Sequence, residues 1–146
     1  MSVTAYLYSK CPYNLLKKLI SDLSSGSTAL KVMLTTSAYT PDQESHDFKD
    51  DITNEITGTG YTAGGAEITS KSVTEASKVT TLDGADVTWA ASTITARRAV
   101  IYDATPATDA TRALLAYIDF GEEQSSSNGN FTIQWNTLGI ITLAVP

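Results

Sequence analysis

Apolar residues recur at every second position along much of the chain. The clearest cases are the segments 30–35 and 131–136, where one face of an extended chain is apolar. This period of two predicts strands with one buried face. Further strands are expected at 94–102, 113–120 and 140–145. The last of these is apolar on both faces, which is typical of a strand covered on both sides.

A hairpin is predicted where the segments 78–82 and 85–89 flank Asp83-Gly84. Asp-Gly is typical of two-residue hairpin turns, because both central residues need a positive φ. Seven or eight short strands at this spacing predict a mostly β chain. We expect one antiparallel β-sandwich domain over the whole chain, 1–146, with a jelly-roll-like arrangement.

Only one segment, 12–24, has a helical period. Pro12 suits the first turn of a helix, where its missing N–H costs no hydrogen bond. Apolar residues then recur at spacings of three and four, at Tyr13, Leu16, Leu19 or Ile20, and Leu23. The pattern predicts one short N-terminal helix with an apolar stripe that lies against a sheet.

Two segments are expected to be loops, 121–130 and the long polar segment 38–65. A loop as long as 38–65 is uncommon in a compact domain and usually has a function. We therefore interpret 38–65 as a contact arm, with one helical turn at 46–51 and the ring of Tyr61 as its anchor. The candidate partner contacts in the arm are Asp42, His46, Phe48 and Tyr61.

Composition narrows the classes of partner. Ten Lys and Arg against sixteen Asp and Glu give a net charge of −6 and a pI near 4.6. This balance argues against a nucleic-acid partner, because such binding depends on clustered positive charge. The chain holds 22 Thr and 15 Ser, so its polar surface is built from hydroxyls more than from charges. A neutral surface can meet another protein without desolvating many charges.

The chain shows no sign of a membrane or secretory context. Its apolar runs are far shorter than a bilayer span, and its first residues do not form a signal peptide. Cys11 is the only cysteine, which excludes an intramolecular disulfide and favours a small buried hydrophobe. We expect no membrane partner and synthesis in the cytoplasm.

Catalytic and metal-binding patterns are weak. Calcium favours several oxygen ligands, but the acidic residues in 38–65 lack the order of an EF-hand loop, so a solvated face is the better interpretation. His46 has no second His or Cys pair with which to build a zinc site. We expect no metal, no cofactor and no enzymatic activity. The acidic residues are Asp42, Glu44, Asp47, Asp50 and Asp51.

Two charged and two aromatic residues lie within the expected strands. Arg97 and Arg98 are neighbours, and neighbouring strand residues point to opposite faces. One of them is then expected to face the core side or an interface; alternatively, both are exposed charges that protect a strand edge. Both are kept as candidate partner contacts. Trp89 and Trp135 are interpreted as core aromatics.

Long stretches of the chain resemble a known family. The stretches that carry the resemblance are 34–43, 46–56, 58–65, 86–89, 92–97, 99–102, 116–121 and 131–135. They are similar to a family of small virion proteins of tailed bacteriophages that are described as head decoration or cement proteins. The resemblance covers nearly the whole chain after the expected helix.

The resemblance implies a structural role without catalysis. Such proteins are small β-sandwiches or jelly rolls that sit on the outer surface of the phage head as homodimers or homotrimers. They bind the major capsid protein non-covalently and stabilise the shell because they bind only the assembled lattice. Two alternatives stay open: a tail or head–tail component, and a carbohydrate-binding adhesion module on the virion. The sugar-binding alternative needs Trp89, Trp135 or Tyr61 exposed on one face.

Overall fold

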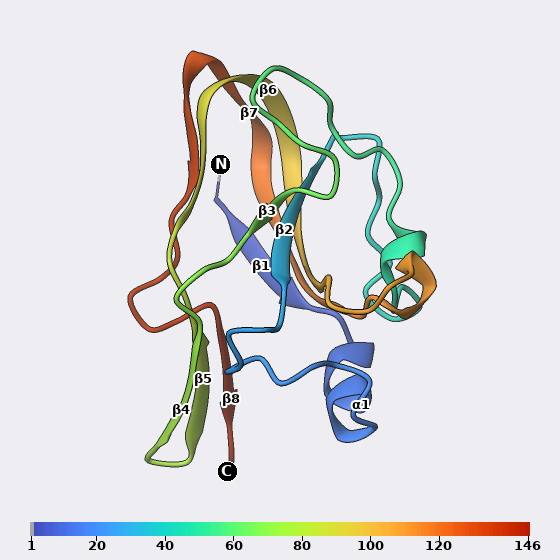
Figure 1. The fold of residues 1–146 in the computed structure, drawn as a ribbon, viewed down its shortest axis with the longest axis vertical. Coiled ribbons are helices and arrows are strands. Elements are labelled where there is room, and N and C mark those ends of the chain that lie inside the picture. The colour runs from blue at the N-terminus through green and yellow to red at the C-terminus, as the bar shows by residue number, and fades with distance from the viewer. Residues whose placement is uncertain (1) are drawn as a thin grey trace.

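The computed structural model describes residues 2–146 of the chain. These residues are mostly β, with a single α-helix and two antiparallel sheets (Figure 1). The larger sheet has the strand order β1-β7-β6-β2-β3 and the smaller one β4-β5-β8. The elements are β1 (Thr4–Leu7), α1 (Lys10–Leu16), β2 (Leu30–Thr35), β3 (Ala66–Glu67), β4 (Ser72–Ala76), β5 (Val79–Asp83), β6 (Val87–Asp103), β7 (Leu114–Ile133) and β8 (Ile141–Ala144), with 3-10 turns at Lys49–Asp51 and Asp109–Thr111.

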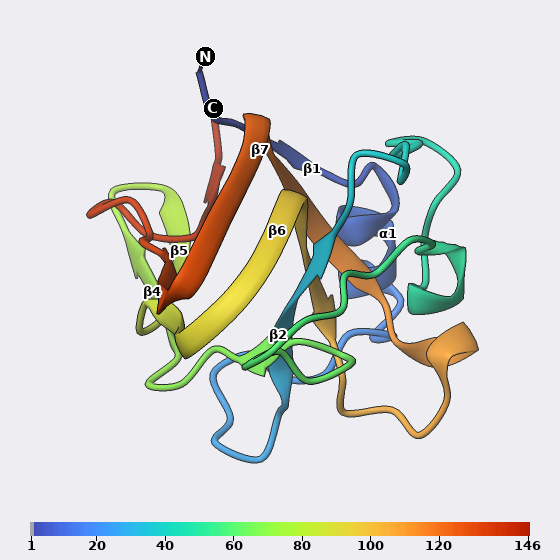
Figure 2. The same cartoon turned by 90° about the horizontal axis from the view of Figure 1, so that it is seen from above.

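β6 and β7 form one long hairpin that bends back over the rest of the larger sheet (Figures 1 and 2). Their pairing shifts register four times, and such bulges increase the bend and twist of a strand pair. Ala91 and Gly121 take left-handed φ values of 47° and 81° within this hairpin. The two halves of the hairpin thus lie in two layers, and the predicted antiparallel sandwich is confirmed. The more specific jelly-roll connectivity stays a prediction.

The larger sheet is covered on both faces where β2, β6 and β7 lie side by side. One face packs into the main core, and the other packs into a smaller cluster. β2 shows this directly, because Val32 belongs to the main core and Met33 to the smaller cluster. The sequence predicted a strand at 30–35 with one buried face; the strand is confirmed, and both of its faces are buried. The smaller cluster consists of Tyr8, Met33, Tyr39, Val100, Tyr102 and Leu114.

The segment 38–65 provides part of this second cover. Tyr39 is 1% exposed in the smaller cluster, and Ile56 is 3% exposed in the main core. The segment is long and irregular as expected, and the helical turn expected at 46–51 is reduced to Lys49–Asp51. However, the segment packs against the sheet instead of projecting as an arm.

The helix is shorter than the predicted 12–24, since it spans only Lys10–Leu16. Lys18 has a left-handed φ of 59°, and the Leu19 N–H donates to the Asn14 carbonyl at 2.9 Å, which closes the helix with a Schellman-type end. The apolar stripe predicted for the helix is also wrong. Leu16, which was expected on the buried face, is 90% exposed, whereas Cys11, which was not part of the stripe, is 2% exposed. Cys11 is thus the small buried hydrophobe that was predicted, and burial raises the pKa of its thiol to about 12.

The hairpin predicted at Asp83-Gly84 does not form. β5 pairs with β4 and β8, whereas β6 pairs with β7 and β2, so the segment 84–86 connects the two sheets and Asp83 is the last residue of β5. The hairpin turn lies instead at Ser77-Lys78, between β4 and β5. Both residues have a positive φ, 52° and 67°, as a two-residue turn of this kind requires.

Two predictions about the C-terminal half are also wrong. The segment 121–130 is not a loop, because β7 continues through it as the partner of β6. The strand at 140–145 exists as β8, but it is an edge strand and not covered on both sides. Leu143 is 39% exposed and Val145 is 66% exposed. Both errors come from long-range pairing that local patterns do not show.

Candidate interaction surface

Arg97 and Arg98 lie on β6 and share one partner, Asp119 of β7. The Arg97 Nε donates to Asp119 Oδ1 at 2.9 Å, and the Arg98 Nε donates to Oδ2 at 3.0 Å. The register shift between Ala96 and Arg98 allows neighbouring side chains to reach the same carboxylate. Arg98 also donates to the Tyr39 carbonyl at 2.6 Å. Both arginines are half-buried, and their polar atoms serve the fold.

The carboxyl group of Asp119 is held in its ionised form. Burial acts to raise its pKa, but the Gly121 N–H and the two guanidinium groups outweigh that effect. The pKa therefore lies below its usual range. Asp119 thus remains a charged partner for both arginines well into the acid range.

Asp119→Asn is expected to lower the free energy of unfolding by about 2 kcal/mol at neutral pH, because two half-buried cations lose their charged partner. Urea unfolding measures the difference. Since the folded-state pKa is depressed, the stabilisation is complete above the unfolded-state pKa of about 4 and is lost as the pH falls through the folded-state value. The gap between the two proteins should therefore close in acid. Glu122→Gln, exposed on the same strand, is the matched control; equal effects of the two changes would contradict this role.

Asp42 and His46 belong to a chain of hydrogen bonds that ends in the smaller cluster. The Asp42 N–H donates to His46 Nδ1 at 3.3 Å, and the Tyr39 hydroxyl lies 2.9 Å from the same nitrogen. Tyr39 in turn lies 2.8 Å from the hydroxyl of Tyr8. Burial raises the pKa of Tyr39 to about 12 and raises that of Tyr8 as well. His46 therefore fastens the loop to the sheet, while the side chain of Asp42 stays exposed.

Tyr61 and Phe48 also hold the segment 38–65 in place. The Tyr61 hydroxyl donates to Glu55 Oε1 at 2.7 Å and accepts from the Leu34 N–H at 3.1 Å. Its ring packs against the main core, as does the half-buried ring of Phe48. The anchoring role predicted for the Tyr61 ring is confirmed. Whether any of the six predicted contact residues meets a partner stays a prediction.

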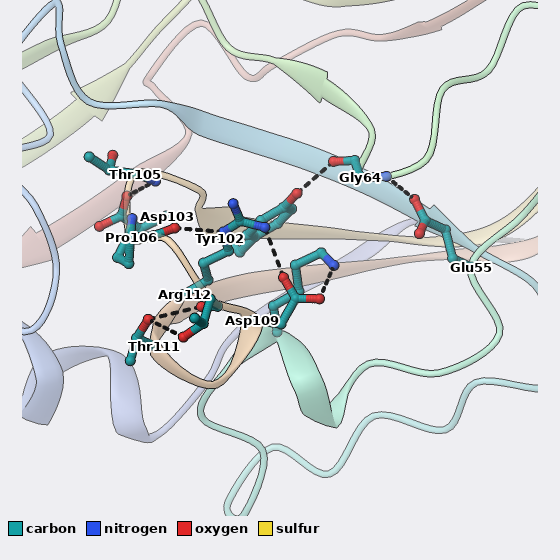
Figure 3. A network of polar contacts seen from close by, with 11 residues as sticks. Glu55, Gly64, Tyr102, Asp103, Thr105, Pro106, Asp109, Thr111 and Arg112 are labelled. Carbon is teal, nitrogen blue, oxygen red and sulfur yellow. Dashed lines mark hydrogen bonds and ion pairs between the residues drawn. The ribbon is translucent and has the colours of Figure 1, made fainter.

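A polar network continues from Glu55 to the loop between β6 and β7 (Figure 3). Glu55 Oε1 accepts from the Gly64 N–H at 2.6 Å, and the Tyr102 hydroxyl donates to the Gly64 carbonyl at 2.7 Å. On the other side of the Tyr102 ring, Arg112 and Lys49 each donate to Asp109 at 2.8 Å. Each of these carboxylates is satisfied by internal donors. The network therefore ties the segment 38–65 to the loop between β6 and β7.

A surface that the sequence did not reveal lies between the two halves of β7. A groove of about 600 Å³ opens there, and both halves of the strand line it. Ile118 and Phe120 come from the first half, Phe131 and Ile133 from the second, and Val3 lies beside them. All of the residues that line the groove are apolar or neutral and polar. The lack of charge is notable in a chain with a net charge of −6.

An unpaired strand edge borders this groove. β1 pairs with the outer edge of β7 only as far as Asp119, and no other strand of the described residues pairs with that edge from Phe120 to Ile133. We call the groove together with this free edge of β7 the open side. The alternation at 131–135 showed which side chains face inward, but pairing partners are not local and leave no signal in the sequence.

Metal sites, membrane spans and aromatic platforms for sugars are the other features considered among the described residues. Within 2–146, no group of three or more His, Cys, Asp or Glu is placed to hold a metal ion, and no helix is long and apolar enough to cross a bilayer. Trp89 is 5% exposed, which confirms it as a core aromatic and removes it as a platform for a sugar ring. Trp135 is half-buried, lines the groove, and donates its indole N–H to the Ala85 carbonyl at 2.9 Å.

Comparison with known proteins adds no relative to this picture. No protein-family model, no curated protein and no solved structure matches the chain.

Proposed function

We propose that this chain is a structural virion protein of a tailed phage: a capsid decoration or cement protein that binds the shell of the major capsid protein without a covalent bond. Its place would be the outer surface of the phage head. The observation that carries the proposal is the open side, where an uncharged groove lies beside the unpaired edge of β7. The resemblance to small phage virion proteins supports it from the sequence.

The chemistry of the open side suits binding to a protein. Unpaired backbone N–H and C=O groups of a strand edge can pair with an extended segment of another chain. The groove beside them can take apolar side chains, and no charge has to be desolvated there. A protein that binds only the assembled shell stabilises it by mass action, without any reaction. Clamps made of internally satisfied side chains, such as Arg97, Arg98 and Asp119, would keep this surface rigid.

Binding to expanded capsids that lack the protein tests the proposal. The purified chain is expected to co-sediment with such capsids and to raise the temperature at which they lose their contents. A chain with Asn130→Lys and Gln134→Lys, two exposed positions in the groove, should bind on the order of tenfold more weakly. Thr74→Lys, exposed on β4 and outside the groove, is the matched control.

The outcomes separate the proposal from its nearest alternative. Incorporation into tails without binding to heads would overturn it in favour of a tail or head–tail component. A map of the whole virion locates the protein directly. Absence of binding to both heads and tails would remove the virion role altogether.

A further inference from the structure

We infer that the outer face of α1, together with a hollow beside the end of the helix, is a second docking surface, which binds a short acidic segment of another protein. This surface is separate from the open side, because no residue of α1 or of the hollow lines the groove. The inference goes beyond the proposed function, since it does not depend on binding to the shell.

α1 presents to solvent the residues that the sequence pattern assigned to a buried face. Tyr13 is 53% exposed, Leu16 is 90% exposed, and Leu19, just beyond the helix, is 42% exposed. The buried residues of the helix, Cys11 and Asn14, lie on its opposite side. Figure 1 shows α1 at the periphery of the molecule, where its outer face is uncovered. An apolar stripe that the fold leaves uncovered is typical of a binding surface.

Lysines surround this stripe. The ammonium groups of Lys10 and Lys17 lie 5.8 and 5.1 Å from the centre of the Tyr13 ring, and these residues are each about one helical turn from it in the sequence. The Lys17 Nζ also donates to the Tyr13 hydroxyl at 3.2 Å. Such cation–π contacts favour defined positions for the two charges. Lys10 is within electrostatic reach of Asp47, but within the described residues neither it nor Lys17 nor Lys18 forms an ion pair.

The positive charge of this region is unusual for the chain, and it selects the occupant. The segment 10–22 holds three Lys and one Asp, a net charge of +2, in a chain whose net charge is −6. Charges are screened beyond about 8 Å at physiological salt, so a short segment bound here meets the local positive charge. An extended anionic surface, such as a membrane, also meets the acidic remainder of the molecule and is repelled. Charge complementarity therefore favours a short acidic segment.

A hollow of about 530 Å³ beside the end of α1 provides a place for an apolar side chain. Leu19, Phe48 and Pro106 line it, and Lys18 lines it as well. Its only acidic lining residue is Asp22. The carboxylates of a bound segment would thus face the lysines, while an apolar side chain of the same segment enters the hollow.

The backbone of Lys18 gives a separate reason to assign a role to its side chain. Lys18 has a left-handed φ of 59° at the helix end, where glycine is the usual residue. A side chain in this conformation costs stability, and such strain is concentrated at functional sites. Lys78 has a similar φ of 67°, but it lies in the turn between β4 and β5. The two lysines therefore provide a matched pair for a test.

Fluorescence anisotropy with a labelled synthetic peptide tests the inference. The probe is a peptide of Glu-Leu repeats, and the same peptide with Gln in place of Glu is its neutral counterpart. The acidic peptide is expected to bind at least about tenfold more tightly than the neutral one, and added salt should weaken its binding. Leu16→Ser, at a position that the fold leaves exposed, should weaken binding on the order of tenfold. Equal binding of the two peptides would contradict the inference.

Lys18→Gly and Lys78→Gly are the matched variants. Each removes one positive charge and one side chain from a left-handed position, so each should raise the urea concentration at the midpoint of unfolding. Only Lys18→Gly should weaken binding of the acidic peptide, on the order of fivefold. Loss of binding in a protein that has become more stable cannot be a folding defect. Equal binding by the two variants would overturn the inference.

Amide hydrogen exchange locates the bound peptide. Protection of the segment 13–22 supports the inference, whereas protection only at 120–133 would place the peptide on the open side and overturn it. Vesicles of phosphatidylserine and phosphatidylcholine test the membrane as the occupant: a chain that binds them and ignores the acidic peptide would also overturn the inference. Binding to expanded capsids is measured separately, with the groove variant Asn130→Lys and Gln134→Lys, so this inference and the proposed function can fail independently.

Discussion

Gly65→Ala is expected to lower the free energy of unfolding by more than about 3 kcal/mol, because the new methyl group has no space in the sheet. Gly65 lies just before β3 with a left-handed φ of 78°. A Cβ there would overlap the carbonyl oxygen of Val32 and lie 2.6 Å from its carbonyl carbon. These are backbone atoms of β2, a strand buried on both faces, so relief would require the sheet itself to move.

Urea unfolding of the purified variants measures this effect. Gly26→Ala is the matched control, because no heavy atom lies within 4 Å of the position its Cβ would take. That change should leave stability unaltered or raise it by up to about 1 kcal/mol, since alanine restricts the unfolded chain. If the two variants were equally stable, the close approach of Gly65 to β2 would be contradicted.

The strands were largely predictable because their signal is local. An alternating run such as 30–35 has one apolar face in any extended conformation, and the structure places β2 over the same residues. The mostly β class follows from several such runs. The burial of Cys11 was also predictable, because a lone Cys beside apolar residues is usually a small buried hydrophobe.

Turns and element ends were harder to predict, because tertiary contacts overrode local preferences. Ser77 and Lys78 form the hairpin turn without Gly or Asn, while Asp83-Gly84, which has the expected residues, lies where β5 ends and the chain passes to the larger sheet. Lys18 ends the helix in a conformation that usually selects glycine. At 121–130 the turn residues are absorbed as irregularities of β7, since pairing with β6 satisfies the backbone on both sides of them.

The open side could not be predicted from the residues at all. The inward-facing side chains Phe131 and Ile133 were visible as an alternating pattern, and they are indeed buried. What makes the site is that, within residues 2–146, no strand pairs with the outer edge of β7 beyond Asp119, which is a property of the whole topology. Conversely, Arg97 and Arg98 stood out by type, but the bulge that turns both toward Asp119 is set by long-range register.

Asp103→Ala is expected to lower the free energy of unfolding by about 3 kcal/mol, because two backbone donors lose a charged acceptor at once. Asp103 ends β6 and is 0% exposed. Its Oδ2 accepts from the Ser21 N–H at 2.8 Å, and its Oδ1 accepts from the Thr105 N–H at 2.9 Å. The side chain thus fastens the segment that follows α1 to the end of the sheet. It also holds the first turn of the β6–β7 loop, where Asp103 and Thr105 lie together (Figure 3).

The expected loss has a local signature that separates it from a general weakening of the core. Amide exchange should rise first at Ser21 and Thr105, and it should stay slow in β2 and the paired part of β7. Asp103→Asn keeps one acceptor oxygen but turns an amide NH₂ toward the second N–H. Its loss of stability should therefore be smaller than that of Asp103→Ala but still measurable against the unchanged protein. Asp22→Asn, exposed and one residue from Ser21, is the control and should change stability by no more than about 0.5 kcal/mol. An Asp103→Ala protein as stable as this control would show that the two hydrogen bonds do not hold the segment to the sheet.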